Sequence, residues 1–355
     1  MAAVPDKLER EYVAALLSDL ESALPLIWGR KVYTIFFGGG TPSLLSAPAI
    51  DELLCAIRAR LPVAPGAEIT LEANPGTFEA GRFRDFRAAG VNRLSIGIQT
   101  FNPGHLKALG RIHDEKEARR AMEIAHANFE NINLDLMYGL PGQTLEEARV
   151  DIATAVSFNT VHVSAYHLTI EPNTSFHRRP PQLPDDDVAA DMQLAVEETL
   201  VANGYRHYET SAFARPGHEC RHNLNYWRFG DYVGIGAGAH GKISFPDRIV
   251  REMRMKHPRD YVQAASRGCQ VQASHPILAS ALPFEFMMNA LRLTDGFPMR
   301  LFEERTGMPI SAALPGLDEA EARSLIVREC DHAVPTHLGR RFLNDLLQIF
   351  LPPTC

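Results

Sequence analysis

Short runs of β-branched and apolar residues alternate with amphipathic segments between residue 31 and about residue 167. Apolar runs of this length predict buried strands, and the segments between them have the period of surface helices. Parallel strands need such crossover helices, so the alternation predicts an α/β fold with a parallel sheet. The predicted strands are Val32–Phe37, Glu68–Ala73, Arg93–Ile98, Ile132–Met137 and Val161–Leu168, and the predicted helices cover about 47–60, 79–89, 114–128 and 144–157.

Two of these helices begin with the pattern of a capping box. Asp114 is followed by Glu117, and Thr144 by Glu147, so each pair can satisfy backbone donors that the first helical turn leaves open. Another helix, about Lys7–Leu24, opens the chain with a leucine or tyrosine at every fourth position. No strand precedes it, which is unusual in a βα-repeating fold, so we expect this chain to lack a first strand.

The chain changes character after these repeats. Leu183–Asp187 predicts the start of a helix that runs to about Ala202, Tyr205–Glu209 predicts one more strand, and the glycine-rich stretch 234–241 has no period. Short helices predicted at about 278–292, 298–306, 318–329 and 336–350 indicate a small helical domain. In the last helix Leu338, Phe342 and Leu346 form one stripe, which favours core packing.

Composition narrows the class of protein. The 355 residues include 36 basic and 43 acidic side chains, and the formal charge of −7 argues against non-specific nucleic-acid binding. No run of about 18 apolar residues occurs, and the N-terminus is charged and helix-patterned, so we expect a cytoplasmic protein without a transmembrane segment. The cysteines are spread singly, which favours neither a disulfide framework nor a compact metal site. They are Cys55, Cys220, Cys269, Cys330 and Cys355.

Glycine or polar residues follow or end four of the predicted strands. Because the carboxyl ends of parallel strands open on one face, we expect these groups to line one cavity. A glycine triplet alone also fits a tight turn, but it lets a ligand approach the main chain closely. No phosphate-loop or dinucleotide-binding spacing is present. The groups are Gly38–Pro42, Glu72 with Asn74 and Pro75, Gln99 with Thr100, and Asp135 before Gly139.

Glu72 and Asp135 lie in otherwise apolar strands, where a carboxylate is costly unless it meets a cation or a hydrogen-bond donor. Each could form only a structural ion pair, for instance with Arg93 or Arg111. Together with Gln99 and Arg111 they also suit a polar cofactor that carries ribose hydroxyls and a carboxylate.

A second cluster is the string HNLNYW at 222–227, just before the glycine-rich stretch that ends near His240. A histidine beside aromatic residues is often a packing residue. Imidazole is also a common axial ligand of heme iron, and tyrosine and tryptophan faces can pack on a porphyrin.

Five ordered strings resemble the HemW-type heme chaperones, which belong with the oxygen-independent coproporphyrinogen III oxidases in the radical S-adenosylmethionine (SAM) superfamily. The resemblance spans about residues 7–351. The strings are FFGGGTPSLL (36–45), LEANPGT (71–77), NRLSIGIQTF (92–101), NLDLMYGLPGQT (133–144) and HNLNYW (222–227).

The resemblance implies a partial, TIM-like (β/α)6 barrel that holds SAM, followed by a small C-terminal helical domain. It divides the chain into an N-terminal helix (1–30), a barrel (31–212), a segment that completes the core (213–275) and a C-terminal domain (276–355). It implies that Gly39, Gly40 and Thr41 contact the methionyl end of SAM. It implies that Glu72 contacts the ribose or nearby polar groups, and that Gln99, Arg111 and Asp135 complete the site.

The resemblance also implies a heme site formed by His222, Asn223, Tyr226 and Trp227, and this string favours a chaperone over an oxidase. The expected function is therefore heme binding and transfer to an acceptor protein. An oxygen-independent coproporphyrinogen III oxidase and a clusterless, inactive fragment stay as alternatives, and whether the chain is an enzyme stays open.

One departure from the family concerns iron. The resemblance implies a [4Fe-4S] cluster held by a CxxxCxxC motif just after the first strand, but no cysteine precedes Cys55. The missing cysteines and the missing strand would occupy the same stretch upstream of Met1. We therefore expect a truncated chain or a start codon assigned too late, with a truly clusterless relative as the alternative. On either interpretation we expect no radical chemistry from this polypeptide.

Overall fold

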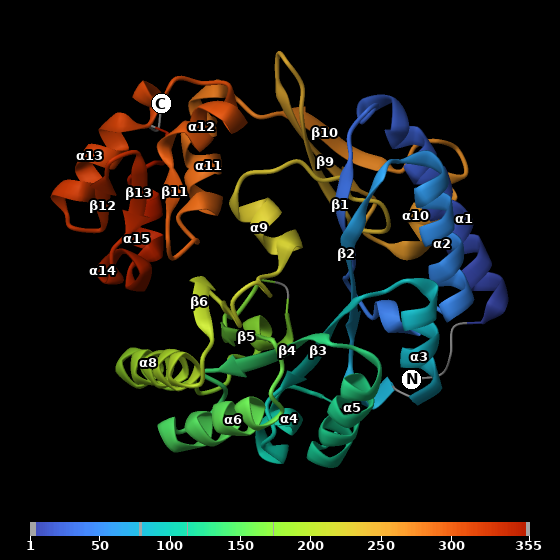
Figure 1. Ribbon diagram of the computed structural model, residues 1–355, viewed down its shortest axis with the longest axis horizontal. Helices are drawn as coiled ribbons and strands as arrows, with labels where there is room; N and C mark the ends of the chain where they lie inside the picture. The colour runs from blue at the N-terminus through green and yellow to red at the C-terminus, as the bar shows by residue number, and fades with distance from the viewer. Residues whose placement is uncertain (1–4, 78–79, 112, 173, 353–355) are drawn as a thin grey trace. The chain divides into compact units, whose positions relative to one another are not determined.

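The computed structural model describes residues 5–77, 80–111, 113–172 and 174–352 (Figure 1). Contacts within the chain divide it into two units. Among the described residues, the first unit contains 33–54 and 65–220, and the second contains all others. None of the helices in the described ranges is both long and apolar enough to span a membrane. Residue 79, where one helix was predicted to start, and Cys355 lie outside the described residues.

A seven-stranded sheet runs through the first unit in the order β1-β2-β3-β4-β5-β7-β6. Strands β2 to β5 pair in parallel, and β7 and β6 continue the sheet with antiparallel pairing. All five strands predicted for the repeats and the strand predicted at 205–209 are confirmed, whereas β7 was not predicted. The strands are β1 (Val32–Phe37), β2 (Val63–Ala73), β3 (Arg93–Gln99), β4 (Asn131–Tyr138), β5 (His162–His167), β6 (Arg206–Glu209) and β7 (Ala212–Ala214).

Helices connect these strands, and two of them begin with the capping boxes that the sequence predicted. Both capping boxes are present, with the Asp114 side chain accepting from the Glu117 N–H and the Thr144 side chain from the Glu147 N–H. The short helix α4 and the single turns were not predicted. The helices are α2 (Ala47–Arg60), α3 (Ala80–Ala89), α4 (Pro103–Ala108), α5 (Glu115–Asn128), α6 (Leu145–Ser157), α7 (Ser175–Arg178) and α8 (Asp186–Ala202), with 3-10 turns η2 (Pro42–Leu44) and η3 (Pro75–Thr77).

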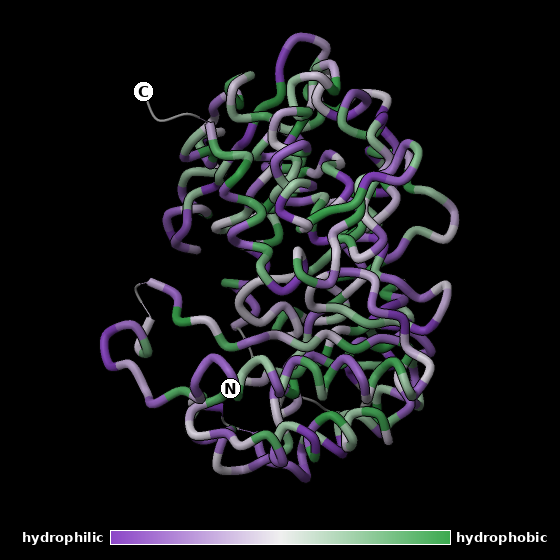
Figure 2. Tube along the Cα trace, turned by 90° about the vertical axis from the view of Figure 1, so that its left-hand side faces the viewer, coloured by the Kyte–Doolittle hydropathy of each residue, from purple (hydrophilic) through white to green (hydrophobic). Residues whose placement is uncertain are grey.

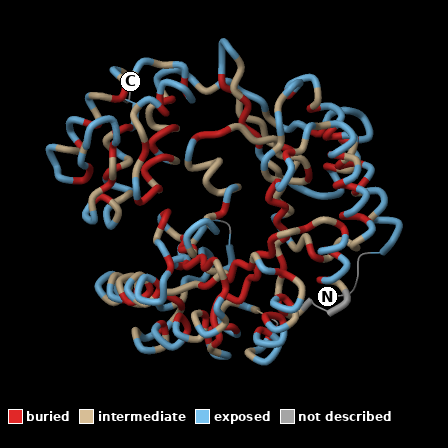
Figure 3. Tube along the Cα trace, in the orientation of Figure 1, coloured by how far each residue is buried: buried red, intermediate tan, exposed pale blue. Residues whose placement is uncertain are grey.

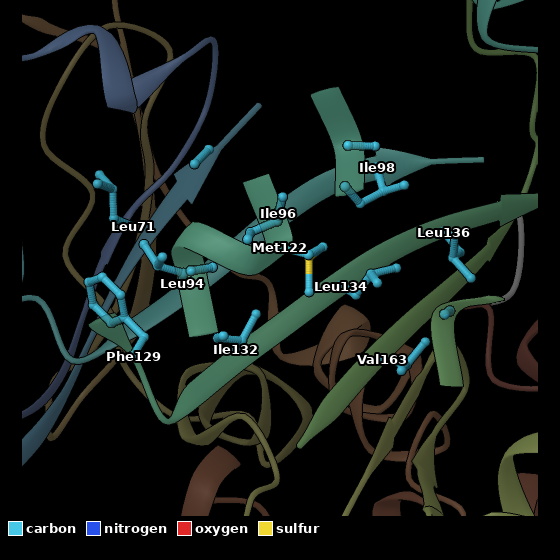
Figure 4. Packing of buried hydrophobic residues seen from close by; sticks show 14 of the residues in the cluster. Leu71, Leu94, Ile96, Ile98, Met122, Phe129, Ile132, Leu134, Leu136 and Val163 are labelled. Carbon is cyan, nitrogen blue, oxygen red and sulfur yellow. The ribbon is translucent and has the colours of Figure 1, made fainter. Parts of the chain in front are cut away.

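The two faces of this sheet differ in chemistry. Alternate strand residues such as Leu94, Ile96 and Leu134 pack against helix residues such as Met122 of α5 (Figure 4). Along the covering helices, hydrophobic and hydrophilic residues alternate (Figure 2), as expected for helices with one buried side. The opposite face carries polar side chains, although β3 is buried along its whole length (Figure 3). One row of this polar face, in register across four strands, is Glu72, Ser95, Asn133 and His162.

The second unit includes the opening helix and a three-stranded antiparallel sheet in the order β10-β9-β8. Helix α1 packs on α10, where the ring centroids of Tyr12 and Tyr261 are 5.8 Å apart. This sheet was not predicted, because β10 is exposed along most of its length and shows no apolar alternation. The elements are α1 (Asp6–Ala23), η1 (Leu24–Leu26), α9 (Arg221–Trp227), β8 (His240–Ser244), β9 (Ile249–Arg254), α10 (Pro258–Ala265) and β10 (Val271–Pro276).

The C-terminal part of this unit is helical, as predicted, but it also contains the sheet β11-β13-β12. The prediction of one helix over 318–329 was wrong, because Ser324 has a left-handed backbone (φ 60°) that ends the helix before a strand begins. The elements are η4 (Ala279–Ala281), α11 (Leu282–Ala290), β11 (Phe297–Pro298), α12 (Met299–Thr306), η5 (Ile310–Ala312), α13 (Leu314–Ala322), β12 (Ile326–Glu329), β13 (His332–Pro335), α14 (His337–Arg341) and α15 (Leu343–Gln348).

The predicted helix over 336–350 was also wrong in its continuity. The backbone of Phe342 (φ −112°, ψ 44°) leaves the helical region and separates α14 from α15. As a result Leu338 and Phe342 are exposed, and only Leu346 of the predicted stripe is buried in the core.

Candidate functional site

The glycine loop after β1 is tied to the next strand. Gly39 (φ 79°) and Gly40 (φ 60°) have left-handed backbones with open space where a Cβ would stand, so conformation rather than crowding requires glycine there. Gly38 is different, because a Cβ would stand 2.6 Å from the Phe36 ring and 3.4 Å from the Glu72 carboxyl carbon. The Gly39 N–H donates to Glu72 Oε2 at 3.0 Å. The loop and the carboxylate therefore form one local structure.

Two carboxylates face this region from neighbouring parts of the sheet. Asp135 Oδ2 accepts from Ser95 Oγ at 2.9 Å, and Asp135 Oδ1 accepts from Asn133 Nδ2 at 2.8 Å. Burial raises the pKa of Asp135, while these hydrogen bonds and the charge of Arg93 act in the opposite direction. Burial also raises the pKa of Glu72, and the negative charge of Asp135 raises it further. A ligand that brings donors or positive charge would relieve both carboxylates.

Arg111 and Thr41 reach the same place through Asn74. Arg111 Nη1 donates to Asn74 Oδ1 at 3.2 Å, and Asn74 Nδ2 lies 3.5 Å from Thr41 Oγ1. Burial lowers the pKa of Arg111, and Asp135 partly opposes this shift. The Arg111 side chain is thus held by the Asn74 amide within range of the Asp135 charge, where a ligand carboxylate would find a fixed cation.

Gln99 ends β3 in a strained conformation. Its φ of 72° is uncommon for a residue with a side chain, and the pairing of β3 with β4 shifts register between Gly97 and Gln99. A Cβ on Gly97 would lie 2.9 Å from Gln99 Nε2 and 3.4 Å from Asn74 Oδ1. The irregularity therefore turns the Gln99 amide toward Asn74, and strain of this kind is concentrated at functional sites.

The structure brings together six residues that the sequence placed in a cofactor site and adds others that the sequence did not select. The carboxylate partners Ser95 and Asn133 were not selected, nor was Tyr166, which lies at the end of β5 and whose pKa is raised by burial and by Asp135. Polar residues alternating with apolar ones along β3, β4 and β5 are the signal that marks them. The six predicted residues are Gly39, Thr41, Glu72, Gln99, Arg111 and Asp135. Gly40, the seventh predicted residue, follows in the loop.

The HNLNYW string forms helix α9 of the second unit, and all six residues are half-buried. The rings of His222 and Tyr226 meet edge to face with centroids 4.8 Å apart, and Tyr226 meets Tyr232 at 4.4 Å. The Arg292 guanidinium lies 4.3 Å from the centre of the Trp227 ring. The indole N–H of Trp227 is buried and has no hydrogen-bond acceptor among the described residues. Asn223 lies between these rings in the sequence.

Comparison with known proteins decides the family. The radical SAM superfamily model matches residues 11–154, and the model of the HemN C-terminal domain matches residues 279–342. The protein from Escherichia coli named heme chaperone HemW is 51% identical over 343 residues, which are 96% of this chain and 90% of that protein. The chain belongs to the HemW family. The resemblance seen in the sequence is therefore confirmed.

Other HemW proteins support the same family assignment, and one solved structure supports the fold. Proteins named heme chaperone HemW from Haemophilus influenzae and Bacillus subtilis are 46% and 36% identical over 97% and 96% of this chain, and over 90% and 91% of their own lengths. The structure of coproporphyrinogen III oxidase (HemN) from E. coli, described as a radical SAM enzyme, has a TM-score of 0.80 and 22% identity. The match covers 98% of this chain and 84% of that one. At that identity the match shows the fold, which confirms the predicted α/β partial barrel with a C-terminal domain.

The four cysteines that the structure describes in this HemW-family chain do not fit a [4Fe-4S] cluster. Cys55 in α2, Cys269 after α10 and Cys330 between β12 and β13 are exposed and lie on different elements, whereas Cys220 is buried. Within the described ranges no group of three or more His, Cys, Asp or Glu side chains is arranged to hold a metal ion. Three thiolates on one loop are what such a cluster needs, so we assign no chemical step to a cluster.

Proposed function

We propose that this chain is a heme chaperone that binds heme at α9 and passes it to an acceptor protein. Relatives that carry this name match nearly the whole chain. The observation that carries the proposal is the half-buried imidazole of His222 within the ring cluster of Tyr226, Trp227 and Tyr232. The proposal includes the cytoplasmic location expected from the sequence.

The chemistry of this cluster suits heme as a cargo. A histidine nitrogen is a common ligand of heme iron, and the neighbouring rings offer apolar faces for a porphyrin plane. The indole N–H of Trp227, buried without an acceptor among the described residues, is a donor for a porphyrin carboxylate. The Arg292 guanidinium over the same indole adds a cation for that carboxylate. His222, Asn223, Tyr226 and Trp227 are the proposed heme residues.

We also propose that the first unit binds SAM. Glu72 and Asp135 offer carboxylates to ribose hydroxyls and to the cationic part of the ligand, and Arg111 offers a cation to its carboxylate. Gly39, Gly40 and Thr41 border the methionyl end, and Gln99 completes the site. SAM supplies a sulfonium centre joined to a nucleoside and an amino acid. The proposal contains no radical step, because the described residues do not fit the cluster that would supply an electron.

Heme titration of the full chain tests the first proposal. Replacing His222 with Ala should weaken heme binding about tenfold or more and change the Soret band, because the iron loses an axial ligand. The matched control is His275→Ala, which removes an exposed histidine from β10 of the same unit and should bind heme like the wild type. An unchanged spectrum and affinity in His222→Ala would remove this residue from the site.

A second experiment separates the chaperone from an oxidase, which the HemN fold leaves as the alternative. The full chain is incubated with coproporphyrinogen III and SAM under anoxic, reducing conditions, and its heme-loaded form is mixed with an apo-hemoprotein. We expect loss of heme to the acceptor, and this is the deciding outcome because a chain without a cluster leaves coproporphyrinogen unchanged under either function. Formation of protoporphyrinogen would contradict the chaperone proposal.

A further inference from the structure

The polar face of the first unit continues inward from Asp135 as an unbroken chain of hydrogen bonds. Asn133 Oδ1 lies 2.6 Å from His162 Nδ1, and His162 Nε2 lies 2.9 Å from the Tyr208 hydroxyl. The backbone N–H of Cys220 donates to the same hydroxyl at 3.3 Å. Asn133, His162, Tyr208 and Cys220 are all buried, and their hydrogen bonds replace those that water would supply.

Only one arrangement of protons satisfies this chain when it is followed from Asp135. A carboxylate accepts hydrogen bonds, so the Asn133 atom that faces Asp135 must be the donor Nδ2, which also donates to Ser95 Oγ at 2.7 Å. The other amide atom is then the acceptor Oδ1, which receives the Ser164 hydroxyl at 3.0 Å. His162 Nδ1 faces this acceptor and must therefore carry the imidazole proton.

The opposite end of the chain is compatible with the same arrangement. The Cys220 N–H can only donate, so it uses a lone pair of the Tyr208 oxygen. Because Nδ1 carries the single proton of the neutral imidazole, Nε2 is an acceptor and the Tyr208 hydroxyl donates to it. Burial, with help from the charges of Arg93 and His218, lowers the pKa of His162 well below its ordinary value. The Cys220 contact is thus compatible with the Nδ1–H tautomer that the Asp135 end requires.

We propose that Tyr208, His162 and Asn133 are positioning residues for ligand binding, because their one-way hydrogen-bond relay fixes Asp135 in the orientation that receives SAM. The inference rests on the proposed SAM site. The direction of the relay is set at the Asp135 end, where the carboxylate only accepts and Asn133 must present its amide N–H. If Asn133 turned over, its oxygen would face the Asp135 carboxylate, and two acceptors would repel each other. His162 prevents this by offering Asn133 a donor.

The tautomer of His162 tests the relay without any ligand. Long-range ¹H–¹⁵N spectra of the full chain with labelled histidine distinguish a proton on Nδ1 from a proton on Nε2. We expect the Nδ1–H tautomer in the wild type, and also in Tyr208→Phe because the Asn133 acceptor that faces Nδ1 remains. The Nε2–H tautomer in the wild type would overturn the relay.

SAM affinity tests what the relay does. Tyr208→Phe should weaken SAM binding by about 3- to 10-fold, the usual effect of one lost hydrogen bond. The matched control is Tyr205→Phe, because Tyr205 is equally buried in the same unit but its hydroxyl donates to the Thr160 carbonyl, outside the relay. It should lose thermal stability to a similar extent and keep the affinity of the wild type. Equal affinity in the two variants would overturn the proposed role.

A pair of changes at His162 distinguishes positioning from packing. His162→Gln keeps an N–H donor for Asn133 and should retain most of the SAM affinity, whereas His162→Leu removes the donor and should not. Equal losses in both would overturn the positioning role. Absence of SAM binding in the wild type would instead contradict the proposed SAM site, and the tautomer measurement would then decide on the relay alone.

Discussion

The two units each hold a cluster of buried polar residues around one aspartate, and the clusters differ in how the charge is balanced. In the second unit Asp19 is fully buried and faces Arg254 Nε at 3.1 Å, the Tyr261 hydroxyl at 2.9 Å and Gln270 Nε2 at 3.2 Å. In the first unit Asp135 receives hydrogen bonds from Ser95 and Asn133, but no described residue forms a salt bridge with it.

This difference distinguishes a scaffold in the second unit from the proposed binding site in the first. Asp19 also accepts from the N–H of Gly236, so its cluster joins α1, β9 and α10 to the glycine-rich stretch, and its charge is matched inside the protein. Asp135 and Glu72 lie close enough for one charge to raise the pKa of the other. Arg93 and Arg111 lie within range of the Asp135 charge but form no salt bridge with it, and carboxylates of this kind are suited to a ligand that supplies a direct cationic partner. The predictions below test this contrast.

The largest effect is expected in the second unit. Asp19→Ala leaves the Arg254 guanidinium buried beside Glu252 alone, and losing one partner of a buried ion pair costs about 3–5 kcal/mol in the free energy of unfolding. Chemical denaturation measures this loss. The control on the same helix is Glu11→Ala, which breaks an exposed pair with Lys7 and should cost less than about 1 kcal/mol. Similar stabilities of the two variants would contradict a scaffold role.

The pH dependence of stability should come from the first cluster. The pKa values of Glu72 and Asp135 are raised in the folded chain above their unfolded values near 4. Between the unfolded and folded values the folded state binds more protons, so its stability falls as the pH rises through this interval. The free energy of unfolding, measured by denaturation at several pH values, should therefore change less with pH for Asp135→Asn than for the wild type. An equal pH dependence of the two proteins would show that Asp135 does not titrate as described.

The smallest effect concerns the shape of the site. Gly97→Ala places a methyl group 2.9 Å from Gln99 Nε2, at the flexible end of that side chain, which can move aside. We expect a loss in the free energy of unfolding below about 1 kcal/mol and a several-fold loss of SAM affinity, since the Gln99 amide is displaced. Calorimetric titration and thermal unfolding of the same sample measure both. Unchanged affinity would place Gln99 outside the site.

The sequence predicted elements whose signals are local and missed those that depend on distant partners. The strands of the barrel and the capping boxes at Asp114 and Thr144 follow from short patterns. Strand β10 has no such pattern, since it is exposed and is held mainly by its pairing with β9. The break at Phe342 depends on one backbone conformation that no periodicity reveals.

The candidate site shows the same division between what local sequence patterns predict and what depends on contacts between distant residues. The motif strings pointed to Glu72 and Asp135, but the sequence alone could not decide whether these carboxylates pair with arginines. The structure gives them hydrogen bonds from Gly39, Ser95 and Asn133 instead. These contacts join residues up to 40 positions apart, so they become visible only when the strands lie side by side.

Titration of SAM into the wild type and into Glu72→Ala, with thermal unfolding of both, tests most directly the claim that this rim of the first unit is a ligand site. The Glu72 carboxylate holds the glycine loop and faces Asp135, so we predict that the variant loses SAM affinity about tenfold or more and unfolds near the wild-type temperature. A variant that binds SAM like the wild type but unfolds at a much lower temperature would contradict the account and assign Glu72 to the scaffold.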